Sequence, residues 1–194
     1  MRIVSYNIYL RVVRRLNKNP AMRKVILGVA VSLDGFIEGP NGEYDWCLTD
    51  QDYGLSDFFK RVDTIFVGRK TYEMSLGMEG SGAGFPQFKE YIFSTTLGKV
   101  KDGATLIKDN IKNEVENIKK EKGKDIWLFG GASLTTSLMN LRLVDELSLA
   151  FHPILLGSGK PLFQHIQDRI NLTLVDTKTY SSGLVSLTYS IENT

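Results

Sequence analysis

Three stretches of the sequence place small, hydroxyl or basic residues where a predicted strand ends and a helix or loop begins. They are "VGRKTYE" (67–73), "FSTTLGK" (93–99) and "FGGASL" (129–134). In an open α/β sheet, ligands bind beyond the carboxyl ends of the strands, and helix N-termini there offer N–H groups and a partial positive charge that suit phosphate. Three such ends, rather than one, indicate a site for a dinucleotide.

The glycine pair Gly130-Gly131 is the most informative of these features. Neither residue has a Cβ atom, so a pyrophosphate can lie directly against the backbone. A helix packed tightly on a strand also favours glycine, so the pair alone does not decide between packing and phosphate contact. The residues predicted to bind the cofactor around this pair are Gly68, Arg69, Lys70, Thr71, Ser94, Thr95, Ala132, Ser133 and Leu134.

Two common nucleotide-binding motifs are missing from the sequence. G-x-G-x-x-G does not follow the first predicted strand, which excludes an ordinary Rossmann domain. G-x-x-x-x-G-K-[ST] is absent as well, which excludes a phosphate-loop NTPase. Any dinucleotide must therefore be bound by a different arrangement of strand ends.

Few side chains stand out as candidates for catalysis, as expected when the cofactor supplies the chemistry. Asp34 follows the first predicted strand and could bind the substrate or relay a proton, or else cap the turn before Gly35. Its neighbour Ser32 could donate a hydrogen bond, or be a buried hydroxyl bonded to the backbone. Tyr44 and Trp46 could form the wall of a substrate pocket by stacking on a flat ring, or serve packing alone.

The two histidines and the single cysteine indicate no metal centre. His152 and His165 lie 13 positions apart with no pattern of Cys or acidic ligands nearby. We expect His152, in "AFHPIL", to bond a backbone partner in the sheet. Cys47 has no second cysteine to pair with, which fits a reducing compartment, and we expect a cytoplasmic protein.

Composition and charge place the chain among globular proteins. The 194 residues are 42% hydrophobic and carry a formal net charge of +2. Residues 1–21 hold five basic residues and no acid, so residues 22–194 sum to −3. This balance predicts no nucleic-acid partner, and the longest apolar run, 25–33, is far short of the ~20 residues that span a bilayer. We interpret 1–21 as an N-terminal extension, either disordered or a miscalled start with Met22 as the true first residue.

Strands and helices alternate along residues 22–194, which form one predicted domain. This order predicts a three-layer α/β fold with a mostly parallel sheet, helices on both faces and a C-terminal antiparallel strand pair. The helix 110–123 has Ile111, Val115 and Ile118 as its apolar stripe, Gly123 as its C-cap, and a charged run (112–124) as a solvated face with i,i+4 pairs. The predicted strands are 24–33, 63–68, 90–95, 104–109, 125–130, 145–155, 170–180 and 184–192, and the other predicted helices are 50–62, 69–75 and 132–142. The segments 34–46 and 77–86 are predicted loops.

The strand-end stretches resemble dihydrofolate reductases. "VGRKTYE" is similar to the segment whose strand end and helix bind the NADPH phosphates in that family, and "FGGASL" resembles its Gly-Gly turn, commonly with a cis peptide. The block 130–163 and "VSLDGFI" (31–37) resemble the reductase domain of the bifunctional riboflavin-biosynthesis deaminase-reductase. The chain is thus identified as a stand-alone member of the dihydrofolate-reductase-like superfamily. The resemblance implies an NADPH-dependent reductase, usually a homodimer, with a pterin or pyrimidine substrate.

Departures from both families leave the substrate open. The riboflavin reductases usually have Lys or Arg after S-L-D-G, where this chain has Phe36, and an arginine-containing stretch for the ribose phosphate, where this chain has "GMEGSGAGFPQF" (77–88). Dihydrofolate reductase needs a carboxylate on the helix after the first strand, where Leu55 falls and Asp57 is out of register. The alternatives are therefore a reductase acting on 5-amino-6-(5-phosphoribosylamino)uracil or a similar heterocycle, a dihydrofolate reductase, and a non-catalytic NADPH-binding protein.

Overall fold

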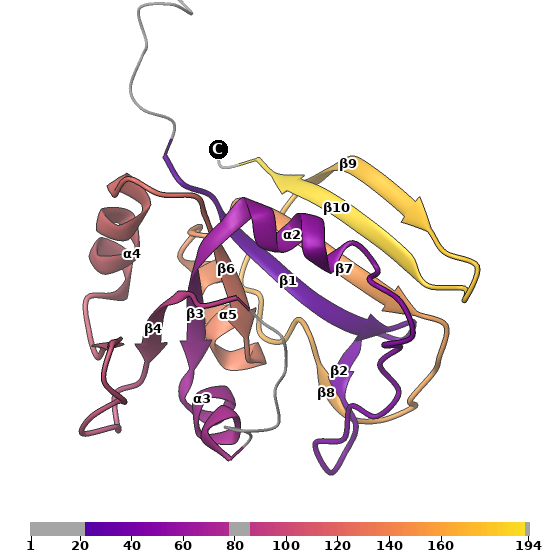
Figure 1. Ribbon diagram of the computed structural model, residues 1–194, viewed down its shortest axis with the longest axis horizontal. Helices are drawn as coiled ribbons and strands as arrows, with labels where there is room; N and C mark the ends of the chain where they lie inside the picture. Colours follow the sequence, from indigo (N-terminus) through magenta and orange to yellow (C-terminus); the bar gives the residue numbers. More distant parts are fainter. Residues whose placement is uncertain (1–21, 78–85, 193–194) are drawn as a thin grey trace, which may run out of the picture.

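A computed structural model of the chain describes residues 22–77 and 86–192. At its centre is an eight-stranded sheet of order β5-β4-β3-β6-β1-β7-β10-β9 (Figure 1). The six strands from β5 to β7 run parallel, and β10 and β9 are antiparallel to their neighbours. The bounds are β1 Val25–Ser32, β3 Val62–Gly68, β4 Lys89–Phe93, β5 Ala104–Ile107, β6 Asp125–Gly130, β7 Glu146–His152, β9 Leu172–Thr179 and β10 Val185–Ile191. The predicted sheet is confirmed.

Helices cover both faces of the sheet, as predicted. They are α2 Leu55–Arg61, α3 Arg69–Leu76, α4 Ile111–Lys120 and α5 Ala132–Asn140. The largest core cluster joins Val115 of α4 and Leu138 of α5 to β1 and its neighbours. A second cluster, around Ile26 and Trp127, packs against the aromatic residues of α2, and a third holds Tyr72 of α3. Because alternate residues of β1 enter different clusters, its sequence is a continuous apolar run.

Two short strands were not predicted. β2 (Phe36–Glu38) and β8 (Lys160–Pro161) pair antiparallel as a separate ribbon, which we call the β2–β8 ribbon. The segment 34–46 was predicted as a loop, which is wrong for its first part. With three and two residues, these strands are too short to show an alternating pattern.

The first helix, α2, is shorter than the predicted 50–62. Gly54 precedes it with φ 85°, a left-handed conformation that cannot continue a helix toward the N-terminus. Asp52 lies just before this end, and its carboxylate accepts a 3.0 Å hydrogen bond from the Ser56 N–H. Local backbone geometry therefore sets the start of α2, and the side chain of Asp52, outside the helix, accepts a hydrogen bond from a backbone N–H of its first turn.

Two expectations for α4 are wrong. The helix ends at Lys120, with Glu121 as C-cap, and Gly123 lies beyond it at a place where a Cβ atom would stand 2.8 Å from Oδ2 of Asp63. The charged run is not wholly a solvated face, because Lys119 is 6% exposed and its Nζ lies 2.7 Å from Asp145 Oδ2, ahead of β7. A lysine stem can cross apolar surface and still place its charge against a carboxylate.

Some predictions concern residues outside the described ranges. The N-terminal extension 1–21 and most of the glycine-rich loop, 78–85, including Phe85, lie outside them. After this gap, Phe88 is half-buried against Trp127 and Tyr91 of β4 is buried. No helix in the described ranges has the length and apolar character needed to cross a membrane.

Candidate functional site

The predicted cofactor residues gather at one edge of the sheet. Gly68 pairs with Phe93 and Val67 with Gly130, so the carboxyl ends of β4, β3 and β6 lie next to one another. Helix α3 begins at Arg69 and α5 at Ala132, immediately after two of these ends (Figure 1). Two helix N-termini therefore open on the same edge, and their partial positive charges favour an anion there.

Gly68, Thr71 and the glycine pair lie in close contact, and we call these four residues the glycine cradle. A Cβ on Gly68 would be 3.5 Å from Gly130 O and Gly131 N, and one on Gly131 would be 3.2 Å from Thr71 Oγ1. The Gly130–Gly131 peptide is cis, as the resemblance implied, and Gly130 has φ 121°. Gly130 is thus required by its conformation, whereas a Cβ at Gly131 would crowd the Thr71 hydroxyl.

The start of α5 supplies backbone donors beside the glycine cradle. Its first intrahelical hydrogen bond runs 3.0 Å from Thr135 N–H to Gly131 O. The N–H groups of Ala132, Ser133 and Leu134 precede that bond, and an α-helix leaves such groups without intrahelical acceptors. The side chains of Ala132 and Leu134 are buried, whereas Ser133 is exposed. Ala132 and Leu134 can therefore contact a ligand only through their backbones.

The charged and hydroxyl residues of this edge are partly engaged with one another. Arg69 Nη1 lies 2.7 Å from Glu73 Oε2 on the same helix. Ser94 Oγ accepts hydrogen bonds from the N–H groups of Leu97, at 3.0 Å, and Thr96, at 3.2 Å. Lys70 and Thr95 are exposed, and Lys70 has no ion pair among the residues that the structure describes. Lys70 can therefore meet a phosphate without giving up an ion pair.

Ser32, the first catalytic candidate, is fully buried at the end of β1. Its hydroxyl donates a 2.6 Å hydrogen bond to Asp34 Oδ1 and accepts one of 2.9 Å from the Phe36 N–H. In the parallel ladder it lies opposite His152 of β7. The Trp46 ring packs edge-on against His152, with 5.3 Å between centroids. The ends of β1 and β7 therefore form a second centre beside the glycine cradle.

Asp34, the second catalytic candidate, clips the loop after β7 to the end of β1. Its carboxylate accepts hydrogen bonds from the N–H groups of Gly157, at 2.7 Å, and Leu156, at 3.2 Å. Within the turn before Gly35, the Gly35 N–H bonds to Ser32 O rather than to this carboxylate, so Asp34 stabilises the turn only through the Ser32 hydroxyl. The Ser32 hydroxyl and the two loop N–H groups lower the pKa of Asp34, so the group is ionised at neutral pH.

His152 and Cys47 have structural surroundings. His152 Nδ1 lies 3.0 Å from Ala150 O, which confirms the predicted backbone partner. Burial lowers the pKa of His152, so the ring is neutral at pH 7. Burial also raises the pKa of the Cys47 thiol to about 11, which keeps it protonated and unreactive. Within residues 22–77 and 86–192, no group of three or more His, Cys, Asp or Glu side chains could hold a metal ion.

Helix α2 presents no carboxylate toward the sheet. Leu55, at the position where dihydrofolate reductases have that group, is 46% exposed. Asp57 Oδ1 bonds to Lys60 Nζ at 2.8 Å on the solvent side. Phe58 faces inward instead and packs against Trp127, with ring centroids 5.4 Å apart. The observed packing agrees with the departure from dihydrofolate reductase read in the sequence.

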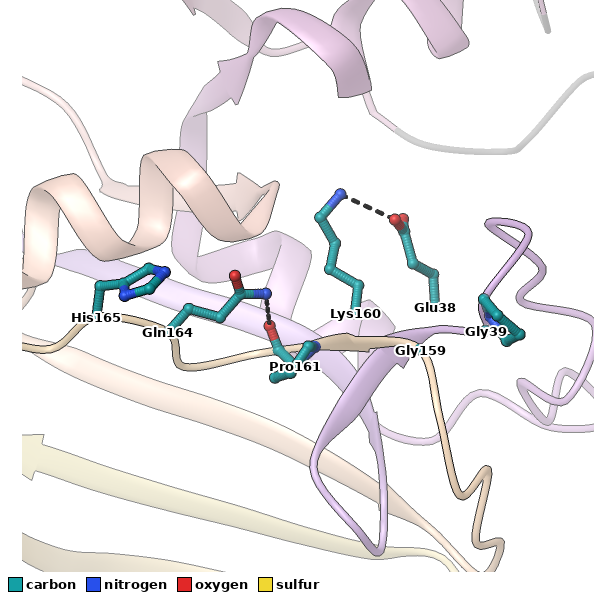
Figure 2. A pocket seen from close by; sticks show the side chains of 8 residues that line it. Glu38, Gly39, Gly159, Lys160, Pro161, Gln164 and His165 are labelled. Atoms are coloured by element: carbon teal, nitrogen blue, oxygen red, sulfur yellow. Dashed lines mark hydrogen bonds and ion pairs between the residues drawn. The ribbon is translucent and has the colours of Figure 1, made fainter.

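The sequence analysis missed one feature of the site, a hollow of about 800 Å3 beside the β2–β8 ribbon. Glu38 and Lys160 face each other across the ribbon and point into the hollow, with Gln164 and His165 further along its wall (Figure 2). Lys160 lies in "LGSGKPLF" (156–163), part of the block 130–163, in which the predicted site residues were confined to Gly130–Leu134. Its two glycines around a serine, followed by a lysine, were the available signal.

Comparison with known proteins identifies the family. Residues 23–186 match the model of the RibD C-terminal domain. The uncharacterized protein YyaP of Bacillus subtilis is 45% identical over 190 residues, which cover 90% of this chain and 98% of YyaP.

Solved structures show the same fold. A protein of Shewanella sp. PV-4 named for riboflavin biosynthesis superposes with a TM-score of 0.76 at 25% identity, covering 88% of this chain and 99% of that one. Dihydrofolate reductase of Enterococcus faecalis, solved in complex with NADP(H), superposes with a TM-score of 0.64 at 17% identity, covering 88% and 97%. The fold is thus dihydrofolate-reductase-like, and the chain belongs to the RibD C-terminal domain family.

Proposed function

We propose that this chain is an NADPH-dependent reductase that transfers a hydride to a small heterocyclic acceptor. The observation that carries the proposal is the glycine cradle, where Gly131 leaves open the space beside Thr71 Oγ1, 3.2 Å from where its Cβ would be. Two helices, α3 and α5, begin at this edge, and helix N-termini favour the phosphates of a dinucleotide. Membership of the RibD C-terminal domain family supports the reductase class, and the fold shared with an NADP(H)-bound enzyme supports the cofactor.

The cofactor, when bound, supplies the hydride, and the chain's residues bind and orient. The N–H groups of Ala132, Ser133 and Leu134 would hold the pyrophosphate. Lys70, with Arg69, Ser94 and Thr95, would select NADPH over NADH by binding a 2′-phosphate, since charge-assisted hydrogen bonds to phosphate are the strong ones. The second centre, Ser32 with Asp34, would position the acceptor end. Because its carboxylate is ionised, Asp34 serves this role as a hydrogen-bond acceptor rather than as a ready proton donor.

The acceptor that family membership favours is a ribosylaminopyrimidine such as 5-amino-6-(5-phosphoribosylamino)uracil. The stretch 77–88 contains no arginine for the ribose phosphate, so we propose an acceptor whose phosphate, if present, is bound elsewhere. Dihydrofolate is the second candidate, which the exposed Leu55 and the paired Asp57 disfavour. A non-catalytic NADPH-binding protein is the third reading. The proposal also includes a cytoplasmic homodimer, as the family resemblance implies.

Fluorescence titration with NADPH and NADH tests the cofactor site. We expect micromolar NADPH binding and weaker NADH binding by the wild type. Gly131→Ala and Gly131→Val keep an allowed backbone conformation, at φ −83° and ψ −164°, but fill the glycine cradle, so both should weaken NADPH binding at least 10-fold. Gly77→Ala is the matched control, because Gly77 lies at the far end of α3. Absence of NADPH binding by the wild type would refute the reductase.

Turnover separates the enzyme from the binding protein. NADPH oxidation is followed at saturating cofactor with dihydrofolate and with aminopyrimidine acceptors that do or do not carry a ribose phosphate. Steady oxidation with any of them excludes the non-catalytic reading. Binding of NADPH without oxidation across both acceptor classes would support the non-catalytic reading instead.

A further inference from the structure

The hollow beside the β2–β8 ribbon is rigidly built. Gly159 has φ 146°, and a Cβ there would lie 2.2 Å from Glu38 O, so only glycine lets the two strands approach. The buried Leu162 anchors β8 in the main core, and its N–H donates a 2.9 Å hydrogen bond to Gly35 O. The backbone of the β2–β8 ribbon, from which Glu38 and Lys160 project, is therefore closely packed and anchored to the core.

The walls of the hollow are attached to elements of both centres of the proposed site. On one side, Thr136 of α5 donates a 2.9 Å hydrogen bond to Gln164 O, so the wall of the hollow is attached to the helix that starts at the glycine cradle. On the other side, β2 begins two residues after Asp34, which clips the loop that leads to β8. The hollow is therefore connected through the chain to both the helix of the glycine cradle and the Asp34 turn.

Glu38 and Lys160 give the hollow its chemistry. Lys160 Nζ lies 2.8 Å from Glu38 Oε1, and the two side chains are 30% and 34% exposed (Figure 2). Because the pair is neutral overall, a bare anion would gain from Lys160 about what it loses to Glu38. A ligand group that both donates and accepts would gain from each partner. Neighbouring ribose hydroxyls are such a group, and a carboxylate is the side chain that binds ribose hydroxyls in many dinucleotide sites.

We infer that the Glu38–Lys160 pair binds the vicinal hydroxyls of a ribose, with Glu38 accepting from them and Lys160 donating to them. The inference rests on the proposed function, because that function supplies the two molecules that could carry this ribose. One is NADPH, through the ribose next to its nicotinamide, and the other is the acceptor, through its ribosyl group. It assigns both residues as specificity determinants that do not take part in the hydride transfer itself.

Binding measurements on Glu38→Gln and Lys160→Met test the inference. The probes are NADPH, adenosine 2′,5′-bisphosphate, which lacks the nicotinamide ribose, and ribose 5-phosphate added at saturating NADPH. If the cofactor supplies the diol, both variants bind NADPH roughly 10-fold more weakly, as loss of a charge-assisted hydrogen bond predicts, and bind the bisphosphate like the wild type. If the acceptor supplies it, only ribose 5-phosphate binding weakens.

Two results would overturn the inference. One is wild-type affinity of both variants for NADPH together with unchanged or undetectable ribose 5-phosphate binding. The other is tighter binding by Glu38→Gln, which would mean that the hollow takes an anion. Glu121→Gln is the matched control, since it breaks a 2.9 Å ion pair with Lys89 at the opposite end of the strands. Melting temperatures of all variants check the fold. Failure of the wild type to bind NADPH would instead refute the proposed function.

Discussion

The carboxylate of Asp34 accepts a 2.7 Å hydrogen bond from the backbone N–H of Gly157, which lies 123 residues further along the chain. This contact and the one to Leu156 hold the loop after β7 against the end of β1. We expect Asp34→Asn to release that loop, because the amide is a weaker acceptor than the carboxylate. Hydrogen exchange of the Leu156 and Gly157 amides should become faster, whereas Asp57→Asn on α2 should leave both rates unchanged.

The two hydrogen bonds between the Asp34 carboxylate and the loop after β7, which we call the Asp34 clip, should also weaken in acid. The lowered pKa of Asp34 lies below the value in the unfolded chain, about 3.9. Its stabilising contribution is therefore fully present above that value and is lost as the pH falls through the lowered folded pKa. Amide protection of Gly157 that persists in Asp34→Asn would show that other contacts hold the loop. In turnover assays a positioning role raises KM, whereas a proton relay lowers kcat and shifts its pH profile.

The sequence predicted a mostly parallel sheet with helices on both faces, the alternation of strands and helices along the chain, and the ends of β3, β4 and β6, where the glycine cradle lies. Those features follow from long apolar runs, such as that of β1, and from helix stripes with a clear period. It did not predict the Asp34 clip or the Glu38–Lys160 pair, because each joins residues more than a hundred positions apart through loops or very short strands. No local pattern encodes such contacts.

The same limit explains why Lys119 was placed in solvent. A charged run on an amphipathic helix predicts exposure for every member, and only the tertiary position of Asp145 shows that one lysine turns inward. Conversely, the sequence could not decide whether Gly130 and Gly131 serve helix packing or phosphate contact, because both select glycine. The structure shows that Gly130 is needed for its φ of 121° whichever ligand binds.

Trp46 should report the protonation of His152. Burial lowers the pKa of His152 below its ordinary value, about 6.5, so the neutral ring stabilises the fold above that value, and this contribution is lost as the pH falls through the lowered pKa. The rings lie 5.3 Å apart, so we expect Trp46 fluorescence to change with a midpoint below pH 6.5. Trp46→Phe and His152→Gln should each remove the transition. A transition that survives in Trp46→Phe would belong to Trp127.

Gly159→Ala should destabilise the β2–β8 ribbon. The φ of 146° and the 2.2 Å approach to Glu38 O leave no place for a methyl group. Strain of this kind costs about 1–3 kcal/mol, so we expect a lower midpoint in urea denaturation and weaker NADPH binding. For the urea midpoint, Gly98→Ala is the control, because a Cβ there meets nothing within 4 Å. Wild-type stability of Gly159→Ala would mean that the two strands can separate freely.

The outer strand β9 offers a test of the proposed homodimer. All its residues are exposed, including Leu172, Leu174 and Val175, at 42%, 53% and 60%. An edge strand of this kind can pair with another chain, and a lysine on it opposes pairing. Light scattering should show a dimer for the wild type and a shift toward monomer for Leu174→Lys. Leu141→Lys, an exposed leucine just after α5, should remain dimeric. A monomeric wild type would reject the homodimer.

Lys119→Met tests the ion pair at the opposite end of the strands from the site. Lys119 Nζ lies 2.8 and 2.7 Å from the two carboxylate oxygens of Asp145, and the side chains are 7% and 21% exposed. Asp145 also accepts a 2.8 Å hydrogen bond from the Val25 N–H at the start of β1. Breaking a buried pair from one side costs several kcal/mol, and the partial exposure of Asp145 reduces this to about 2–4 kcal/mol.

Urea denaturation of Lys119→Met against Lys120→Met measures that cost. Lys120 is the exposed neighbour on α4, so its substitution should change the free energy of unfolding by less than about 0.5 kcal/mol. The difference between the variants should persist in 1 M salt, because buried charges are screened far less than exposed ones. Equal stabilities would mean that Lys119 contributes only its apolar stem. Unchanged NADPH binding by both folded variants would show that this pair stabilises the sheet without shaping the cofactor edge.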